Sequence, residues 1–190
     1  MGTAGAPDSL RVTVWRRLRG LGALYVQQSV CLLPDRPHVA RAVARLAVKV
    51  RADGGTARVL HLRVDQADEQ AGLVEEMRAA VDVEYGEVLE RLPEFFTELD
   101  TETARGRATF AEVEESEADL ARFQAWLAKI AARDYFAASR GESVRAELDR
   151  AGQALAAFEA AALAADTTVA PAPAGRGTAR RPRTIPGGPR

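Results

Sequence analysis

The sequence predicts an α+β protein in which an incomplete ferredoxin-like sheet is followed by an antiparallel helical bundle. Up to Asp65, β-prone runs alternate with helical patterns, whereas after Asp65 the apolar residues recur at helical spacing only. Charge divides at the same place. Residues 1–65 carry 11 Lys and Arg against 4 Asp and Glu, a net charge of +7, and residues 66–170 carry 10 against 23, a net charge of −13. We therefore predict four regions: a disordered N-terminus at 1–8, a ferredoxin-like module at 9–65, an acidic helical bundle at 66–165 and a disordered basic tail at 166–190.

The first predicted element is a basic amphipathic helix. Leu10, Val14 and Leu18 are four residues apart and line one face of a helix, and Trp15 widens that face. Glycines directly after residue 19 allow the helix to end. Four arginines lie mostly off the apolar stripe: Arg11, Arg16, Arg17 and Arg19.

A hairpin, a second helix and a third strand follow. Runs 23–26 and 30–33 are β-prone and are joined by a polar connection of hairpin length. A second helix is expected over 35–51, and segment 57–64 alternates apolar and polar residues as a half-exposed strand does. This order, α-β-β-α-β, lacks the first strand of a β-α-β-β-α-β unit. Residues 1–6 do not resemble a strand, so we expect that the recorded start codon lies too far downstream; the alternative is an open slot in the sheet.

Three helices are expected in the acidic region. Apolar residues recur at helical spacing over about 65–100, 110–136 and 139–163. Pro93 is expected to kink or break the first of these helices, because proline removes a backbone hydrogen bond and clashes with the preceding turn. Short links favour antiparallel neighbours. Both tryptophans fall on apolar stripes and are expected in the core.

The N-terminal helix and hairpin resemble a known family. Residues 14–34, VWRRLRGLGALYVQQSVCLLP, are similar to the N-terminal domain of the bacterial chromate-resistance regulators of the ChrB family, in which a VWR-x-L-x-x-LGA helix precedes a V/L-Q-x-x-V-x-x-LP hairpin. The segments Thr109–Glu112 and Trp126–Phe136 are similar to that family as well. The resemblance implies a chromate-responsive transcriptional regulator or an accessory resistance protein. It also implies a first apolar strand, which residues 1–6 do not supply, and a further C-terminal domain.

The arginines of the first helix are the candidate DNA-binding or anion-binding residues. A guanidinium group donates two hydrogen bonds at once to phosphate, and it equally suits chromate, a tetrahedral dianion. Such contacts give affinity for DNA without reading its sequence, and no helix-turn-helix spacing is recognisable. The alternative is that these arginines pair with acids of the long helix. The candidates are Arg11, Arg16, Arg17 and Arg19, and the acids are Glu84, Glu87, Glu90 and Glu94.

Residues suited to catalysis or metal binding are poorly grouped. His38 and His61 have no recognisable spacing to Cys31, and the motifs HExxH, CxxC, GxGxxG and the P-loop do not occur. The acidic run 112–119 is typical of a solvated helix face rather than a cation site. We therefore predict a non-catalytic protein with no metal and no cofactor. No apolar run approaches the ~20 residues of a membrane span, and no signal region is present, so we expect a cytoplasmic protein without membrane contact.

These observations predict a DNA-binding transcriptional regulator or accessory protein of chromate resistance. DNA and chromate, or another oxyanion, are the expected partners. The alternative is a protein–protein interaction module that docks through its helices or its open sheet edge without binding DNA, and a homodimer is among the assemblies considered.

Overall fold

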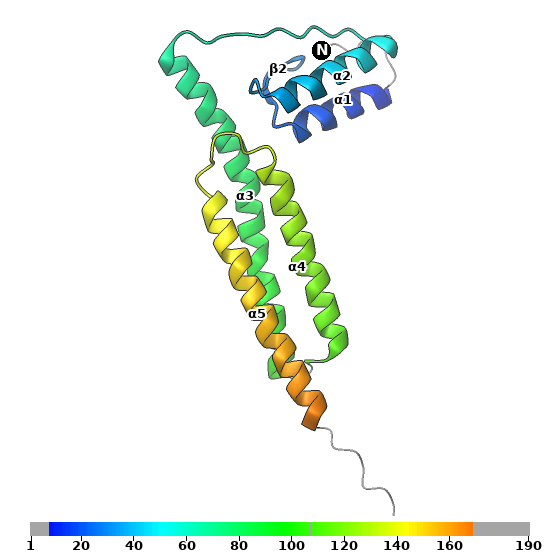
Figure 1. The fold of residues 1–190 in the computed structure, drawn as a ribbon, viewed down its shortest axis with the longest axis vertical. Coiled ribbons are helices and arrows are strands. Elements are labelled where there is room, and N and C mark those ends of the chain that lie inside the picture. The colour runs from blue at the N-terminus through cyan, green and yellow to red at the C-terminus, as the bar shows by residue number, and fades with distance from the viewer. Residues whose placement is uncertain (1–7, 107, 169–190) are drawn as a thin grey trace, which may run out of the picture.

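A computed structural model describes residues 8–106 and 108–168 of the chain. They form a small module of two helices and a hairpin at one end of a long three-helix bundle (Figure 1). The α+β class and the helical bundle are therefore confirmed. The elements are α1, Asp8–Gly20; β1, Leu24–Gln27; β2, Val30–Leu32; α2, Pro37–Ala52; α3, Ala67–Ala104; α4, Phe110–Ala131; and α5, Gly141–Thr168.

The ends of the described chain differ slightly from the predicted boundaries. Asp8 belongs to α1 and residues 166–168 belong to α5, so both helices extend a little further than predicted. The rest of the two segments predicted to be disordered, 1–7 and 169–190, lies outside the described residues.

The core of the N-terminal module lies between its two helices and the hairpin. Leu10, Val14 and Leu18 of α1 are buried, as the spacing predicts, and α2 contributes Leu46 and Val50. The two strands pair antiparallel, with Leu24 opposite Leu32 and Tyr25 opposite Cys31, and one irregularity follows before Gln27 pairs with Val30. The side chain of Cys31 is partly buried against this core.

The predicted third strand is wrong. Residues 57–66 form neither helix nor strand, and the sheet of the described residues has two strands. In a β-α-β-β-α-β unit the last strand pairs with the first. No strand among the described residues pairs with 57–64, and Leu60 and Leu62 are 75% and 66% exposed. A complete ferredoxin-like sheet is therefore not formed by these residues.

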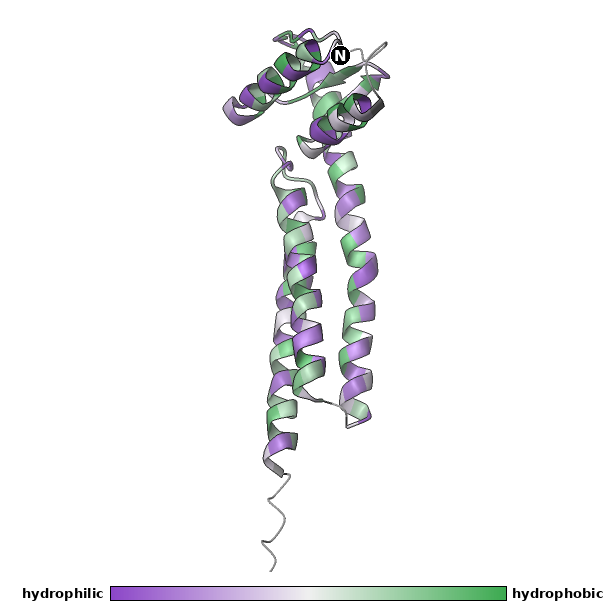
Figure 2. Ribbon diagram, turned by 90° about the vertical axis from the view of Figure 1, so that its right-hand side faces the viewer, coloured by the Kyte–Doolittle hydropathy of each residue, from purple (hydrophilic) through white to green (hydrophobic). Residues whose placement is uncertain are grey.

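The bundle has one continuous aliphatic and aromatic core. Helices α3, α4 and α5 run antiparallel in sequence order, and apolar and polar faces alternate around each helix (Figure 2). Along α5, apolar residues at helical spacing are buried, whereas Leu163 is 57% exposed; the buried residues are Val144, Leu148, Leu155, Phe158 and Ala162. The largest fully buried side chains of the bundle are Tyr85, Val88, Leu92, Ile130 and Val144.

Three local predictions are corrected by the structure. Pro93 does not break α3, which continues from Ala67 to Ala104; the neighbouring Leu92 is buried between the other two helices, and this packing offsets one lost backbone bond. Helix α4 ends at Ala131, earlier than predicted. Trp15 is 46% exposed and not a core residue, whereas Trp126 is partly buried against the bundle core.

Candidate functional site

A groove on the outer surface of the module runs between α1 and α2. We call it the α1/α2 groove; its volume is about 480 Å³. Its walls are side chains spaced three or four residues apart on each helix, because such residues share one helical face. The lining residues are Thr13, Arg16, Arg17, Gly20 and Leu21 on one side and Ala42, Arg45, Leu46 and Lys49 on the other.

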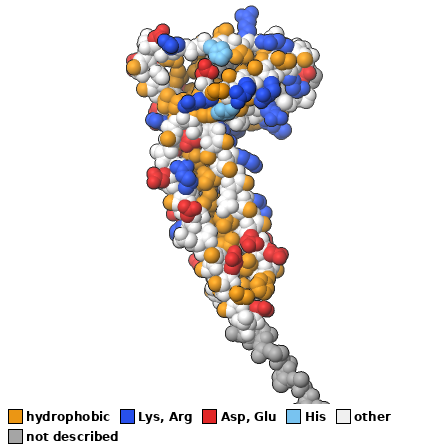
Figure 3. Space-filling view, viewed as in Figure 1, with side chains coloured by type: hydrophobic (Ala, Val, Ile, Leu, Met, Phe, Trp, Pro, Cys, Tyr) orange, Lys and Arg blue, Asp and Glu red, His pale blue; other side chains and the backbone are white. Residues whose placement is uncertain are grey.

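The α1/α2 groove is strongly positive. Arg16, Arg17 and Arg45 are exposed, and none of them forms an ion pair with an acid of the described chain. Lys49 pairs with Asp53 at 2.8 Å, one turn further along α2. Figure 3 shows Lys and Arg side chains gathered over this end of the molecule, whereas most of the visible Asp and Glu side chains lie along the bundle. Four cations therefore face one depression with a single acid beside them.

The four arginines predicted as candidates do not form one patch. Arg16 and Arg17 line the α1/α2 groove. Arg19 lies over the ring of Trp15, with 5.2 Å between its guanidinium carbon and the ring centroid, and faces the bundle. Arg11 is exposed near the start of α1 and lines neither depression.

The alternative in which the long helix neutralises these arginines is not what the structure shows for Arg16, Arg17 and Arg19. Glu84 pairs instead with Arg133 of the bundle itself. The sequence argument also missed Arg45 and Lys49 as groove residues. Arg45 and Lys49 are four residues apart on the face of the second helix opposite its apolar stripe, which is visible in the sequence. That these two residues lie next to α1 depends on how the two helices pack.

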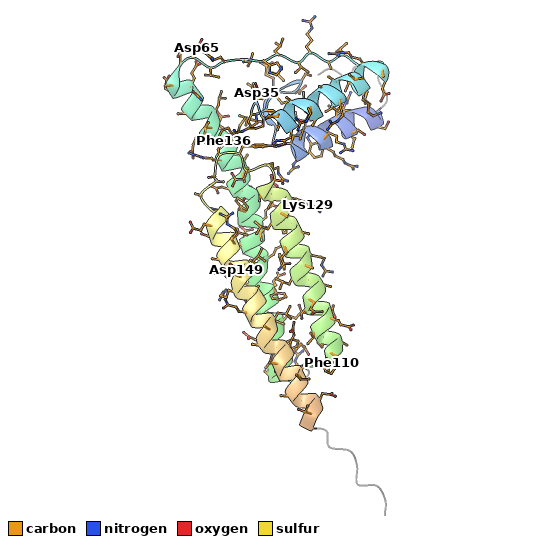
Figure 4. The ribbon with its side chains drawn as sticks, in the orientation of Figure 1. Asp35, Asp65, Phe110, Lys129, Phe136 and Asp149 are labelled. Atoms are coloured by element: carbon orange, nitrogen blue, oxygen red, sulfur yellow. The ribbon has the colours of Figure 1, made fainter. Side chains whose placement is uncertain are left out.

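The module docks on the bundle through the turn between α1 and β1. The hydroxyl of Tyr135 donates to the carbonyl oxygen of Leu21 at 3.1 Å. Gly22, at φ +74°, lies against Arg133 and Tyr135, and a Cβ there would approach three of their atoms at 3.2 Å each. The imidazole of His38 packs against the ring of Tyr135, with centroids 5.9 Å apart. In Figure 4, Phe136 marks this end of the bundle and Phe110 marks the opposite end.

Helix α3 holds the loop 132–140 that carries the docking residues. Asp82 accepts hydrogen bonds from the hydroxyl of Ser139 at 2.7 Å and from the backbone N–H groups of Ser139 at 3.3 Å and Arg140 at 2.8 Å. Burial opposes ionisation of Asp82, but these hydrogen bonds and the charge of Arg140 outweigh it and lower the pKa of the carboxyl. The loop is therefore fastened at the start of α5.

A second fastening joins α3 to the same loop. The hydroxyl of Tyr85 lies 3.2 Å from Oδ2 of Asp134 and donates to it, and both carboxylate oxygens of Asp134 accept from the N–H of Ala138. Burial, followed by the charge of Asp134 and this hydrogen bond, raises the pKa of Tyr85 to about 12. The surface that meets the module is thus held in place by polar contacts from α3 and within the loop.

The residues considered for catalysis remain scattered. Burial raises the pKa of the Cys31 thiol, which disfavours the nucleophilic thiolate. His61 is exposed on the extended segment, with Nδ1 3.4 Å from Oδ2 of Asp35. Within 8–106 and 108–168 there is no group of three or more His, Cys, Asp or Glu placed to hold a metal ion. Across the same ranges no helix is both long and apolar enough to cross a membrane.

Comparison with known protein families gives one match. The family model described as "Protein ChrB, N-terminal" matches residues 11–169. The chain belongs to the ChrB N-terminal family. Membership of the ChrB family implies a role in the regulation of chromate resistance. No curated protein and no solved structure gives a significant match. The matched range includes the α1/α2 groove and the whole described bundle, so both are parts of this family's domain.

Proposed function

We propose that the chain is a non-catalytic, cytoplasmic regulator of chromate resistance that binds DNA through the α1/α2 groove. The observation that carries this proposal is the set of groove cations without acidic partners, Arg16, Arg17 and Arg45, with Lys49 beside them. Such a group supports contacts to consecutive phosphates, because arginine matches phosphate oxygens with two parallel donors.

The predicted binding is to the DNA backbone rather than to base edges. Each phosphate that a cation neutralises releases a counterion, so the logarithm of the binding constant falls with the logarithm of salt concentration by about 0.9 per contact. If all four groove cations each contact one phosphate, the slope is roughly −3.6. The acidic bundle points away from the groove and would repel the duplex, which restricts contact to the module.

Fluorescence anisotropy with duplex DNA across a salt series tests this proposal. Replacing Arg16, Arg17 and Arg45 together by glutamine should reduce the slope by about 2.7 and weaken binding at least about tenfold at low salt. The matched control is R122Q/K129Q/R145Q, which removes the same charge from exposed positions of the bundle. If both triple variants lose the same affinity for DNA, the loss depends on net charge alone, and the α1/α2 groove is not the binding site.

Chromate, or another oxyanion, is the second part of the proposal. A tetrahedral dianion presents the same charge and acceptor geometry as a phosphate group, so it would compete for the same guanidinium groups. Chromate should release DNA from the chain at an ionic strength at which chloride does not. If chromate and chloride act equally at matched ionic strength, this part is wrong, although DNA binding would stand.

A second candidate function is docking of another protein without DNA. It is favoured by exposed apolar side chains on two parts of the module: Val26 and Val30 of the hairpin are 56% and 49% exposed, and Leu60 and Leu62 of the extended segment are exposed as well. This function predicts a complex or a homodimer whose formation is lost in L60D/L62D. Light scattering after size-exclusion chromatography measures it, and a monomer at high concentration would count against self-association.

A further inference from the structure

A cleft separates the N-terminal module from the bundle. We call it the inter-module cleft; its volume is about 320 Å³. Side chains of α1 and β1 form one wall, and side chains of α3 and of loop 132–140 form the other. Small-molecule sites commonly have this size and lie where two structural units meet.

Several large apolar side chains line the inter-module cleft and remain exposed. Trp15, Tyr25 and Val83 are 46%, 39% and 62% exposed, and all three line it, together with Met77 and Phe136. Contact of these three side chains with water is unfavourable, and a ligand that covers them gains free energy in proportion to the apolar area that it removes from water. Apolar groups converging from two units therefore offer a ligand more burial than scattered exposed residues do.

One positive charge beside these walls is available to a ligand. The guanidinium of Arg19 lies over Trp15 and has no acidic partner in the part of the chain that the structure describes. The other cations of the cleft are engaged. Arg133 pairs with Glu84, and Nε of Arg78 donates to the carbonyl oxygen of Phe136 at 2.7 Å. Three acids also line the cleft: Glu84 pairs with Arg133, Asp134 accepts from Tyr85 and Ala138, and Glu87 lies on the α3 wall. The cleft thus combines an aromatic wall and one unpaired guanidinium on α1 with the carboxylate of Glu87 on α3.

We propose that the inter-module cleft binds a small organic anion with an aromatic or aliphatic body and one carboxylate, sulfonate or phosphate group. The body would cover Trp15, Tyr25 and Val83, and the anionic group would accept hydrogen bonds from Arg19. A hydrated inorganic oxyanion would gain only the arginine, and a neutral aromatic compound would gain only the walls. A ligand that has both parts is therefore preferred.

The position of the cleft connects it to α1 as a whole. Trp15 and Arg19 face the cleft, whereas Arg16 and Arg17 of the same helix face the α1/α2 groove. A ligand held between module and bundle would fix the position of α1 relative to the bundle. The site itself does not rest on the proposed DNA binding, because its walls and its charge are separate from the groove.

Titration with four probes tests the proposal, with Trp15 as the reporter. In the W126F variant Trp15 is the one remaining tryptophan of the chain, since the sequence has two. Benzenesulfonate carries body and charge, sulfate carries charge only, benzyl alcohol carries the body only, and benzylammonium carries the opposite charge. Benzenesulfonate should shift the emission of Trp15 and bind at least about fivefold more tightly than the other three, as expected for one charge-assisted contact. Isothermal titration of the unmodified chain checks the same ranking.

Variants on both walls complete the test. R19Q should weaken benzenesulfonate binding about fivefold to tenfold, whereas R41Q, at an exposed arginine of α2 outside the cleft, should leave it unchanged. V83E, at an exposed position of α3, should weaken binding by adding a negative charge to the opposite wall. Equal affinity for benzenesulfonate, sulfate and benzyl alcohol, or equal effects of R19Q and R41Q, would overturn the proposal. DNA binding by the α1/α2 groove is measured separately and does not depend on these results.

Discussion

Replacing Gly22 with alanine should destabilise the chain more than the same replacement at Gly54. Both glycines have positive φ, +74° and +83°, which alanine adopts only with strain. They differ in their surroundings. A Cβ at Gly22 would meet Cβ and the carbonyl oxygen of Arg133 and Cε2 of Tyr135, each at 3.2 Å, whereas a Cβ at Gly54 meets nothing within 4 Å.

The magnitude follows from these two terms. The left-handed conformation destabilises a non-glycine residue by roughly 1–2 kcal/mol, and this applies to both variants. Crowding at a packed contact destabilises by about a further 1–3 kcal/mol, and this applies only to G22A. We therefore expect a loss in unfolding free energy of about 1–2 kcal/mol for G54A and about 2–5 kcal/mol for G22A. The additional loss has an upper bound, namely the free energy of docking between module and bundle, because undocking relieves the crowding.

Urea unfolding followed by circular dichroism measures both variants in the W126F background, in which Trp15 is the one remaining tryptophan and its emission reports the cleft beside the docking contact. The expected result for G22A is a lower midpoint than for G54A and a shift of Trp15 emission in the native state, because the cleft opens. Equal unfolding free energies for G22A and G54A, with unchanged emission, would refute the reasoning. That result would mean that the turn after α1 does not bear on the bundle in solution.

Two further predictions concern loop 132–140. In an absorbance titration Tyr85 should be the last tyrosine to ionise, with a pKa of about 12, and the last component should disappear in Y85F. Because the folded pKa of Tyr85 is raised above the ordinary value of 10.0, the stabilisation by Tyr85 is complete below pH 10 and should be lost as the pH rises toward 12. An unfolding free energy that does not change between pH 10 and pH 12 would contradict this prediction. Replacing Asp82 by alanine should cost about 1–2 kcal/mol, as loss of a helix cap does. Folding lowers the pKa of Asp82 below its ordinary value of 3.8, so the stabilisation by Asp82 should be complete above pH 3.8 and should be lost as the pH falls through the folded pKa. The unfolding free energies of D82A and the parent chain should therefore become equal in strong acid.

Periodicity was sufficient to predict most of the core. The apolar stripe of α1 and the buried face of α5 follow from helical spacing, because burial of one helical face does not depend on which neighbour provides it. The hairpin follows from two β-prone runs joined by a short polar connection. Leu10, Val14 and Leu18 are buried as that argument requires.

The errors arose where a residue's state depends on a neighbour that sequence does not specify. Segment 57–64 has a strand pattern, but no strand of the described residues pairs with it, and residues 58–63 are exposed. Pro93 lies in a helix held by two others, which outweighs its local cost. Trp15 adjoins the buried stripe of α1 but faces the cleft. In each case packing between elements overrode a local preference.

The candidate site was predictable only in part. The positive charge of the first helix is visible in the sequence, and so is the absence of a catalytic motif. The division of its arginines was not. Arg17 and Arg19, two positions apart, point about 160° apart around a helix of 3.6 residues per turn, so Arg17 lines the groove toward α2 and Arg19 faces the bundle on the same side as Trp15, four positions earlier. Arg16 lies between these two directions, and the packing of α2 against α1 decides that it lines the groove.

The sequence by itself determined the secondary structure of the helices, the division of charge between the two parts and the family. These depend on local spacing and composition, which do not change with the arrangement of the chain. The tertiary structure decided which cations share a groove, which aromatic side chains remain in contact with water and where a cleft opens between module and bundle. Those features depend on the packing of α1 against α2 and on the docking of its terminal turn to loop 132–140, which bring together residues more than a hundred positions apart, such as Leu21 and Tyr135.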